Sequence, residues 1–334
     1  MIEVSHLTKT YGAHTAVSDL SFTVEDGQVY GFLGPNGAGK STTMNIITGC
    51  LAANSGTVSI DGLDIFEDAI SAKKKIGYLP ELPPLYVDMT TREYLSFVSK
   101  AKGIKKDEAL KQIETVLKET GIESVQNRLI KNLSKGYKQR VGIAQALLGE
   151  PSIIILDEPT VGLDPKQIIE IRTLIKALGE KHTVILSSHI LSEVQAICDK
   201  IMIISSGRLV ACDTPENLEK LFAGKSTLEI TAKAEITDMA DVLADIRHIE
   251  NISCKDGEKK GTVDISIEFE KDEDIAEDVF YAFCKHNKPI LKMIAKTASL
   301  EDIFIELTSK DEEIDEPGEE KIKDEGGDEN ESNI

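Results

Sequence analysis

The segment from Gly34 to Thr42 has the residue types and the spacing that bind phosphate. It contains the pattern G-x-x-x-x-G-K-[ST], placed after a short apolar run and before a segment predicted to be helical. Glycines let the backbone turn tightly and direct several N–H groups at one phosphate, and the start of a helix adds the positive end of its dipole. We therefore predict a nucleoside triphosphate site. Its candidate binding residues are Gly34, Pro35, Asn36, Gly37, Ala38, Gly39, Lys40, Ser41 and Thr42.

Side chains in two separate segments could support phosphoryl chemistry at that site. Lys40 should reach the β- and γ-phosphates, and Ser41 should ligate Mg²⁺. Asp157 and Glu158 directly follow the apolar run 153–156, which predicts a buried strand with two acids at its carboxyl end. Asp157 would hold Mg²⁺, and Glu158 would accept a proton from the attacking water. The alternative is that the two acids only form a turn or cap after the strand.

The elements needed to position these groups can be read along residues 1–224, an expected α/β domain. Alternating apolar residues in Ile2–Tyr11 and Ala16–Val24 predict an antiparallel pair of strands, and the apolar run Val29–Leu33 predicts a strand buried on both faces. Strand and helix patterns alternate again from residue 153 to 205, which indicates a largely parallel sheet with crossover helices. Between these parts, helical spacing predicts an inserted helical subdomain at about 82–135.

Two further segments follow a change of composition near Gly224. Residues 225–308 show the order strand, helix, strand, strand, helix, strand, helix, and the first six elements match the split βαβ, or ferredoxin-like, unit. We expect a small α+β accessory domain there. Residues 309–334 contain twelve acids, three lysines and no aromatic residue, so they predict a disordered acidic tail.

Composition limits the classes of function that remain. The 334 residues carry 38 Lys and Arg against 58 Asp and Glu, a net charge of −20, which argues against a basic nucleic-acid-binding protein. The five cysteines form no C-x-x-C pair, which argues against a disulfide framework or a zinc site and fits a reducing cytosol. No apolar run is long enough to span a bilayer, so any work at a membrane would need a separate membrane subunit.

A third motif gives these pieces a family resemblance. The segment Leu133-Ser134-Lys135-Gly136-Tyr137 resembles the signature segment, usually Leu-Ser-Gly-Gly-Gln, of the ATP-binding subunits of ABC transporters. With the phosphate segment and the strand-end acids in family order, the resemblance covers roughly residues 1–224. Ser134 and Gly136 match, whereas Lys135 and Tyr137 depart. Taken alone, Ser134 could equally be a helix N-cap.

The resemblance also assigns roles to single residues whose ordinary roles are structural. It implies that Tyr11 lies against adenine, that Asp164 belongs to a subunit-interface loop, and that His189 contacts the γ-phosphate. Glu81 falls where the family usually has a Gln that contacts Mg²⁺, and its extra negative charge puts that role in question. The metal ligands implied are Ser41, Glu81 and Asp157, and the catalytic residues are Lys40, Glu158 and His189.

The same resemblance implies a mechanism and partners. Two copies, or this chain and a paired ABC subunit, would enclose two ATP molecules head to tail and drive export through a separate transmembrane permease. Glu81, the Leu-Ser-Lys-Gly segment and the small C-terminal domain resemble subunits that serve ABC-2 type permeases in bacteria. The chain would then be cytoplasmic and peripheral on the inner face of the cell membrane. The exposed apolar stretch 82–86 is the candidate permease contact, unless it is a packed loop.

Two other readings keep the nucleotide site but change its use. One is a soluble ABC ATPase that acts on ribosomes or DNA, although the chain has one phosphate-binding motif and no sustained heptads. The other is a regulatory sensor that binds ATP and barely hydrolyses it. The presence of Glu158 and His189 argues against the sensor, and a steady-state ATPase assay distinguishes a sensor from an ATPase that turns over.

Overall fold

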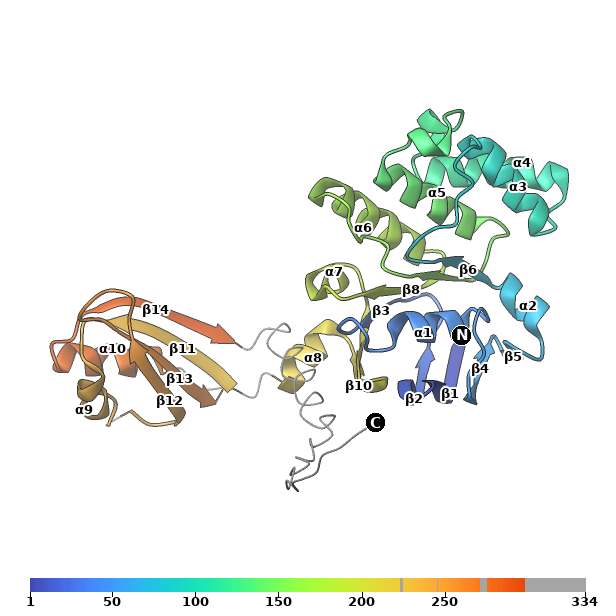
Figure 1. Cartoon of the computed structure of the whole chain (residues 1–334). Helices are drawn as coiled ribbons and strands as arrows, with labels where there is room; N and C mark the ends of the chain where they lie inside the picture. The colour runs from blue at the N-terminus through green and yellow to red at the C-terminus, as the bar shows by residue number, and fades with distance from the viewer. Residues whose placement is uncertain (223–224, 245, 271–274, 298–334) are drawn as a thin grey trace, which may run out of the picture.

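A computed structural model describes residues 1–222, 225–244, 246–270 and 275–297 (Figure 1). The expected helix at about 299–308 and the expected acidic tail 309–334 lie outside the described residues. Within the described ranges, no helix is long and apolar enough to cross a membrane.

A six-stranded sheet lies at the centre of the N-terminal part, in the order β10-β9-β3-β8-β7-β6. The pairings of β9, β3, β8, β7 and β6 are parallel, and β10 is antiparallel to β9. The carboxyl ends of parallel strands share one edge, where ligands bind in open α/β sheets. This edge carries the segments that follow β3, β7 and β8. The strands are β3 (Val29–Leu33), β6 (Ile76–Leu79), β7 (Ile153–Leu156), β8 (Thr183–Ser188), β9 (Lys200–Ser205) and β10 (Arg208–Asp213).

Two hydrophobic cores cover the two faces of this sheet. Successive residues of a strand point to opposite faces, so Ile154 and Leu156 enter one core while Ile153 and Ile155 enter the other. All four are inaccessible to solvent. This explains why β7 is a continuous apolar run rather than an alternating one, and why it holds the following acids at a fixed place.

A second, antiparallel sheet packs against the first through one of these cores, in the order β2-β1-β4-β5. The expected antiparallel pair is present as β1 (Ile2–Tyr11) and β2 (His14–Val24), joined by a turn at Gly12. The strands β4 (Ser55–Ile60) and β5 (Leu63–Asp64) were not predicted from the sequence. Helix α1 (Lys40–Ile47) begins within the phosphate segment, where a helical segment was expected.

Three helices lie between β6 and β7 in the chain: α3 (Thr91–Ala101), α4 (Lys106–Glu119) and α5 (Lys135–Leu147). The predicted insertion at about 82–135 contains α3 and α4, whereas α5 begins where it ends. Short 3₁₀ turns at Glu123–Val125 and Ile130–Asn132 connect α4 to α5. Thr90 and Glu93 form a capping box that starts α3. The Ser134 hydroxyl accepts a hydrogen bond from the Tyr137 amide at 3.3 Å and so caps α5.

The other helices of this part are α2 (Ala69–Lys74), α6 (Pro165–Gly179), α7 (Leu191–Gln195) and α8 (Pro215–Phe222). Asp164 caps α6, because its Oδ1 accepts a hydrogen bond from the Gln167 amide at 2.9 Å. Pro165 occupies the first turn of this helix, where its missing N–H costs nothing.

A separate unit with its own core follows, and it stands apart from the sheets described above (Figure 1). Its four strands pair antiparallel in the order β12-β13-β11-β14, with helices α9 and α10 between strands along the chain. The apolar residues Ile230 and Ile265 of the central strands and Phe283 of α10 belong to this core. The elements are β11 (Lys225–Ala232), a 3₁₀ turn (Ile236–Asp238), α9 (Met239–Leu243), β12 (Ile249–Asp256), β13 (Val263–Glu270), α10 (Ala276–Lys285) and β14 (Ile290–Thr297).

Candidate nucleotide site

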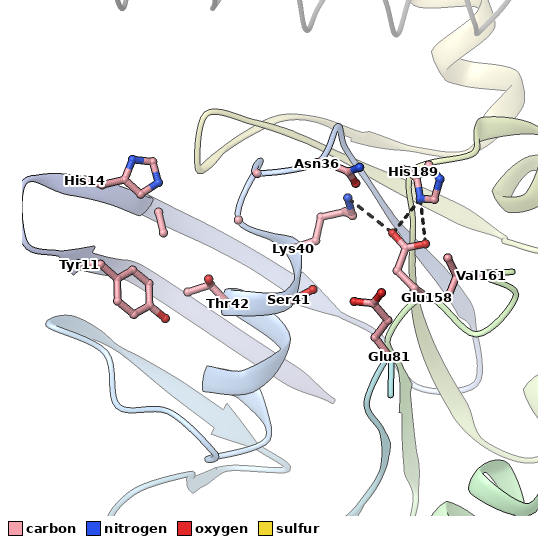
Figure 2. A pocket seen from close by; sticks show the side chains of 13 residues that line it. Tyr11, His14, Asn36, Lys40, Ser41, Thr42, Glu81, Glu158, Val161 and His189 are labelled. Atoms are coloured by element: carbon pink, nitrogen blue, oxygen red, sulfur yellow. Dashed lines mark hydrogen bonds and ion pairs between the residues drawn. The ribbon is translucent and has the colours of Figure 1, made fainter. Parts of the chain in front are cut away.

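A cavity of about 380 Å³ opens at the carboxyl edge of the central sheet. The phosphate segment, residues 34–42, is called the P-loop below. Figure 2 shows it between two groups of side chains: Tyr11 and His14 on the β1–β2 hairpin, and Glu158 and His189 on the opposite side. The lining residues are Tyr11, His14, Ala16, Asn36, Gly37, Gly39, Lys40, Ser41, Thr42, Glu81, Glu158, Val161 and His189. The segments after four strands, β3, β6, β7 and β8, and one hairpin therefore contribute to a single cavity.

The P-loop backbone requires glycine at two of its positions. Gly39 has a φ of 99°, in the left-handed region, and a Cβ added there would lie 2.3 Å from the carbonyl oxygen of Ala16. At Gly34, an added Cβ would lie 2.4 Å from the carbonyl oxygen of Ile204. The loop therefore packs closely against β2 and β9, which fixes its curvature at the start of α1.

Lys40 is buried, with 6% of its surface exposed, and its ammonium lies among oxygens. Its Nζ donates to the carbonyl oxygens of Gly34 at 2.8 Å and Pro35 at 3.1 Å, and it lies 3.7 Å from Oε1 of Glu158. Burial lowers the pKa of Lys40, while the charges of Glu158 and Asp157 oppose that shift. A cation held in this way can meet the charge of a triphosphate.

Asp157 and Ser41 place two oxygen atoms that could ligate a metal ion next to each other. The Ser41 hydroxyl lies 3.3 Å from Oδ1 of Asp157, which is 3% exposed. A hydroxyl and a carboxylate are hard oxygen ligands that suit Mg²⁺, which usually takes one or two protein ligands and completes its shell with phosphate and water. The described residues hold no group of three or more His, Cys, Asp or Glu side chains able to bind a metal ion, so phosphate oxygens would have to contribute.

Glu158 has an unusual backbone and a fixed side chain. Its φ is 47°, in the left-handed region that non-glycine residues rarely adopt. Its carboxylate oxygens lie 3.0 and 3.1 Å from Nδ1 of His189, and the residue is 7% exposed. Held by Lys40 on one side and His189 on the other, this carboxylate is directed into the cavity, where it can accept a proton (Figure 2).

A second cavity, of about 300 Å³, is lined by three other predicted site residues. Ser134 and Gly136 at the start of α5 line it together with Asp164 at the start of α6. Gly136 is buried, and an added Cβ would lie 2.7 Å from Oε1 of Gln167. Neither these residues nor any other lining residue of this cavity belongs to the first one.

The structure therefore divides the predicted residues into three groups. The first cavity takes Tyr11, Glu81, His189 and most of the P-loop, and the second takes the signature residues and Asp164. Gly34, Pro35, Ala38 and Asp157 line neither cavity. Ala38 is a core residue, 3% exposed, while Gly34 and Pro35 act through the carbonyl oxygens that hold Lys40.

Some lining or supporting residues were not predicted. His14, Ala16 and Val161 line the first cavity, and Ser187 contacts both acids after β7. His14 pairs with Tyr11 across the hairpin, so the position of Tyr11 could have pointed to it. Ser187 ends the apolar run of β8, and a polar residue there is a signal of the same kind as Asp157 after β7.

Comparisons with known proteins agree with this geometry. Residues 17–161 match the family model described as ABC transporter. The linearmycin resistance ATP-binding protein LnrL of Bacillus subtilis is 32% identical over 311 residues, covering 93% of this chain and 99% of that protein. The bacitracin transport ATP-binding protein BcrA of Bacillus licheniformis is 42% identical over 212 residues, covering 63% of this chain and 68% of that protein.

Solved structures show the same fold. A structure titled as the ATP binding subunit of an ABC transporter superposes with a TM-score of 0.60 at 33% identity, covering 66% of this chain and 93% of that one. The ATP-binding cassette MJ0796, in a dimeric post-hydrolysis state bound to ADP and Pi, superposes with a TM-score of 0.59 at 28% identity, covering 64% of this chain and 98% of that one. The expected P-loop ATPase fold is thereby confirmed.

Proposed function

The chain belongs to the ATP-binding subunits of ABC transporters, and from this premise we propose how its own residues bind and hydrolyse ATP and which type of permease it serves. It is an ATPase that couples ATP hydrolysis to transport, and proteins of this family dimerise and work with a membrane permease. The predicted family and activity are confirmed. The roles of single residues, the ABC-2 permease type and the position at the membrane are proposals.

The observation that carries the residue assignment is the separation of the two cavities. The first holds the P-loop, Glu158 and His189, and the second holds Ser134, Gly136 and Asp164. A single copy thus has the proposed general base, Glu158, and the P-loop in one cavity and the signature residues in another. Two copies facing head to tail would place the signature residues of one against the ATP of the other. A homodimer is the simplest such pair.

Within the first cavity the side chains divide the work. Tyr11, which is 50% exposed, offers its ring to the adenine of ATP. Lys40 neutralises the β- and γ-phosphates, and the carboxylate of Glu158, oriented by His189, accepts the proton of the attacking water. Ser41 and Asp157, with Glu81 at the cavity wall, would hold Mg²⁺, which offsets charge on the phosphates when bound. Positioning and electrostatics, without a covalent intermediate, account for the proposed catalysis.

The helical insertion offers a surface for the permease. Leu82 is 80% exposed and Tyr86 is 52% exposed, and the Tyr86 ring meets that of Phe97 edge to face at 5.1 Å. Pro83 and Leu85, in contrast, face inward: Leu85 packs against a core, and Pro83 lies next to Gly142. The packed-loop alternative therefore holds for Pro83 and Leu85, and we propose Leu82 and Tyr86 as the permease contact. Exposed aromatic residues beside buried anchors are typical of binding hot spots.

We assign an ABC-2 type permease as the partner and the inner face of the cell membrane as the place of action. Support comes from relatives named for bacitracin transport, lantibiotic transport and linearmycin resistance. Residues 225–308 would form an accessory domain of the ferredoxin-like type, since the strand order β12-β13-β11-β14 is that of a split βαβ sheet. Mg²⁺ and ATP are the cofactor and the substrate of this proposal.

The deciding experiment replaces Glu158 with Gln. The amide keeps the shape of the side chain but accepts no proton at neutral pH, so ATP should still bind while turnover falls by about a thousandfold or more. Size-exclusion chromatography with light scattering should then detect a dimer that forms with MgATP and not with MgADP. Wild-type turnover by E158Q would remove Glu158 from the role of base, and a monomer at saturating MgATP would contradict the head-to-tail pair.

A further inference from the structure

Ser187 is a buried hydroxyl for which the mechanism above gives no role. It lies near the carboxyl end of β8, and it is inaccessible to solvent. The parallel register of β7 and β8 pairs Leu156 with Leu186, so the next positions, Asp157 and Ser187, lie side by side. A buried hydroxyl needs hydrogen-bond partners within the protein.

The partners of Ser187 are the two acids that follow β7. Its hydroxyl donates to Oδ1 of Asp157 at 2.5 Å and accepts a hydrogen bond from the backbone N–H of Glu158 at 2.9 Å. A hydroxyl has one proton to donate and can accept through its lone pairs, so these contacts use it in both capacities. The bond to the carboxylate has the short length of a charge-assisted hydrogen bond.

These contacts fix two groups that the reaction needs. Oδ1 of Asp157 also lies 3.3 Å from the Ser41 hydroxyl, so one carboxylate oxygen lies between two hydroxyls and the rotation of the side chain is restricted. The amide of Glu158 is held where φ is 47°, a conformation that a non-glycine residue keeps only when its surroundings impose it. A change at Ser187 would free both acids at once.

We propose that Ser187 is a positioning residue for ATP hydrolysis, which orients the Asp157 carboxylate toward the metal and the Glu158 backbone toward the attacking water. The proposal rests on the roles assigned to Asp157 and Glu158 above. Ser187 itself reaches neither substrate nor metal in this scheme, because its hydroxyl is already engaged by the two acids.

Ser188 provides a matched control on the same strand. It is also buried, at 1% exposed, and its hydroxyl accepts a hydrogen bond from the Ile190 amide at 3.0 Å and lies 3.3 Å from Glu193. It has no contact with Asp157 or Glu158 among its hydrogen bonds in the described residues. Ser188→Ala therefore removes a buried hydroxyl of the same kind without removing a hydrogen bond of Asp157 or Glu158.

The test compares Ser187→Ala, Ser187→Cys and Ser188→Ala in the full chain. Cysteine fills the volume of serine but forms only weak hydrogen bonds, so it separates hydrogen bonding from packing. Two measurements are needed: the steady-state ATPase rate, and the binding of a fluorescent, non-hydrolysable ATP analogue as Mg²⁺ is titrated. Thermal unfolding of each variant reports the loss of stability.

For both Ser187 variants, kcat should fall about 10- to 100-fold while KM for ATP stays within about threefold, because the groups displaced act on water and metal. The Mg²⁺ concentration at half-maximal analogue binding should rise at least about fivefold. Ser188→Ala should keep kcat and the Mg²⁺ requirement within about threefold of wild type at a similar loss of Tm. Equal losses of kcat in S187A and S188A, or a wild-type kcat in S187C, would overturn the proposal.

A failure of this inference differs from a failure of the proposed function. Should Glu158→Gln turn over ATP normally, the base assignment fails whatever Ser187 does. Should Glu158→Gln be inactive while Ser187→Ala keeps the wild-type kcat and Mg²⁺ requirement, only the role of Ser187 is removed.

Discussion

Lys40 and Glu158 form a buried ion pair, with Nζ and Oε1 3.7 Å apart and both residues less than a tenth exposed. The pair joins the start of α1 to the end of β7, two elements that are more than a hundred residues apart in the chain. Because the ammonium also binds two P-loop carbonyl oxygens, the phosphate-binding loop and the proposed base have a fixed relation. The predictions below depend on groups around this pair.

Lys40→Met should weaken nucleotide binding strongly. Loss of a buried charge that pairs with phosphate removes about 3 kcal/mol or more of binding free energy, roughly a hundredfold in Kd for MgATP.

The same substitution should change how stability depends on pH. Burial lowers the pKa of Lys40, so the folded wild type binds fewer protons than the unfolded chain between that lowered pKa and the ordinary 10.5. This part of the free energy of unfolding rises with pH in that window and is absent in K40M. Fluorescence titration measures the affinity, and denaturant unfolding from pH 8 to 10.5 compares the two proteins. Tight ATP binding by K40M would contradict the site.

His189→Ala should lower kcat and leave ATP affinity nearly unchanged. The imidazole Nδ1 lies 3.0 Å from Oε2 of Glu158, and without it the carboxylate loses one of its two orienting contacts. We expect kcat to fall about 100-fold, in the range for a group that supports general base catalysis, with KM within about threefold. His182, whose Nδ1 contacts the carbonyl oxygen of Pro151 at 2.8 Å outside the first cavity, gives the control His182→Ala. Equal effects of the two substitutions on kcat would show that the loss is structural.

Glu81→Gln should strengthen ATP binding when Mg²⁺ is scarce. Glu81 lines the cavity, and its charge is one of those that raise the pKa of Lys40 against the effect of burial. A carboxylate a few ångströms from a triphosphate costs about 1 kcal/mol in a partly solvated site, so its removal should lower Kd roughly fivefold.

The matched control for Glu81 is Glu67→Gln, an exposed glutamate outside the cavity, which should leave Kd unchanged. The measurement is analogue binding at low and at saturating Mg²⁺. Weaker binding by E81Q at every Mg²⁺ concentration would contradict the prediction, because it would show that metal ligation by Glu81 outweighs the repulsion between its charge and the phosphates.

Tyr86→Ala should separate ATP hydrolysis from permease binding. Tyr86 is exposed beside Phe97, and neither residue lines the first cavity. Truncation of an aromatic hot spot costs about 2–4 kcal/mol, so co-purification with the permease should be lost while the ATPase rate of the isolated chain stays within about twofold. Phe66→Ala removes another aromatic residue, 42% exposed, and should leave both properties intact. Normal permease binding by Y86A would place the docking surface elsewhere.

Several features of the site could be predicted because they depend on local spacing. Glycines at fixed intervals determine where backbone N–H groups point, and an apolar run followed by Asp157 and Glu158 places acids at the end of a buried strand. The same holds for Ser134 and Asp164, whose helix-capping bonds reach only three residues along the chain. The strands β4 and β5 escaped prediction, because these short, partly exposed segments gain their stability from sheet pairing, β4 with β1 and β5 with β4.

The sequence by itself therefore determined the phosphate chemistry, the α/β class and the family resemblance of this protein. Only the tertiary structure decided which distant side chains meet: that Lys40 pairs with Glu158, that Ser187 holds Asp157, and that the signature residues line a different cavity from the P-loop. The physical reason is register. Which residue of β8 lies beside Asp157 is set by how Ile154, Leu156 and their neighbours pack into the two cores, and a shift of one residue would turn Ser187 away from the acids.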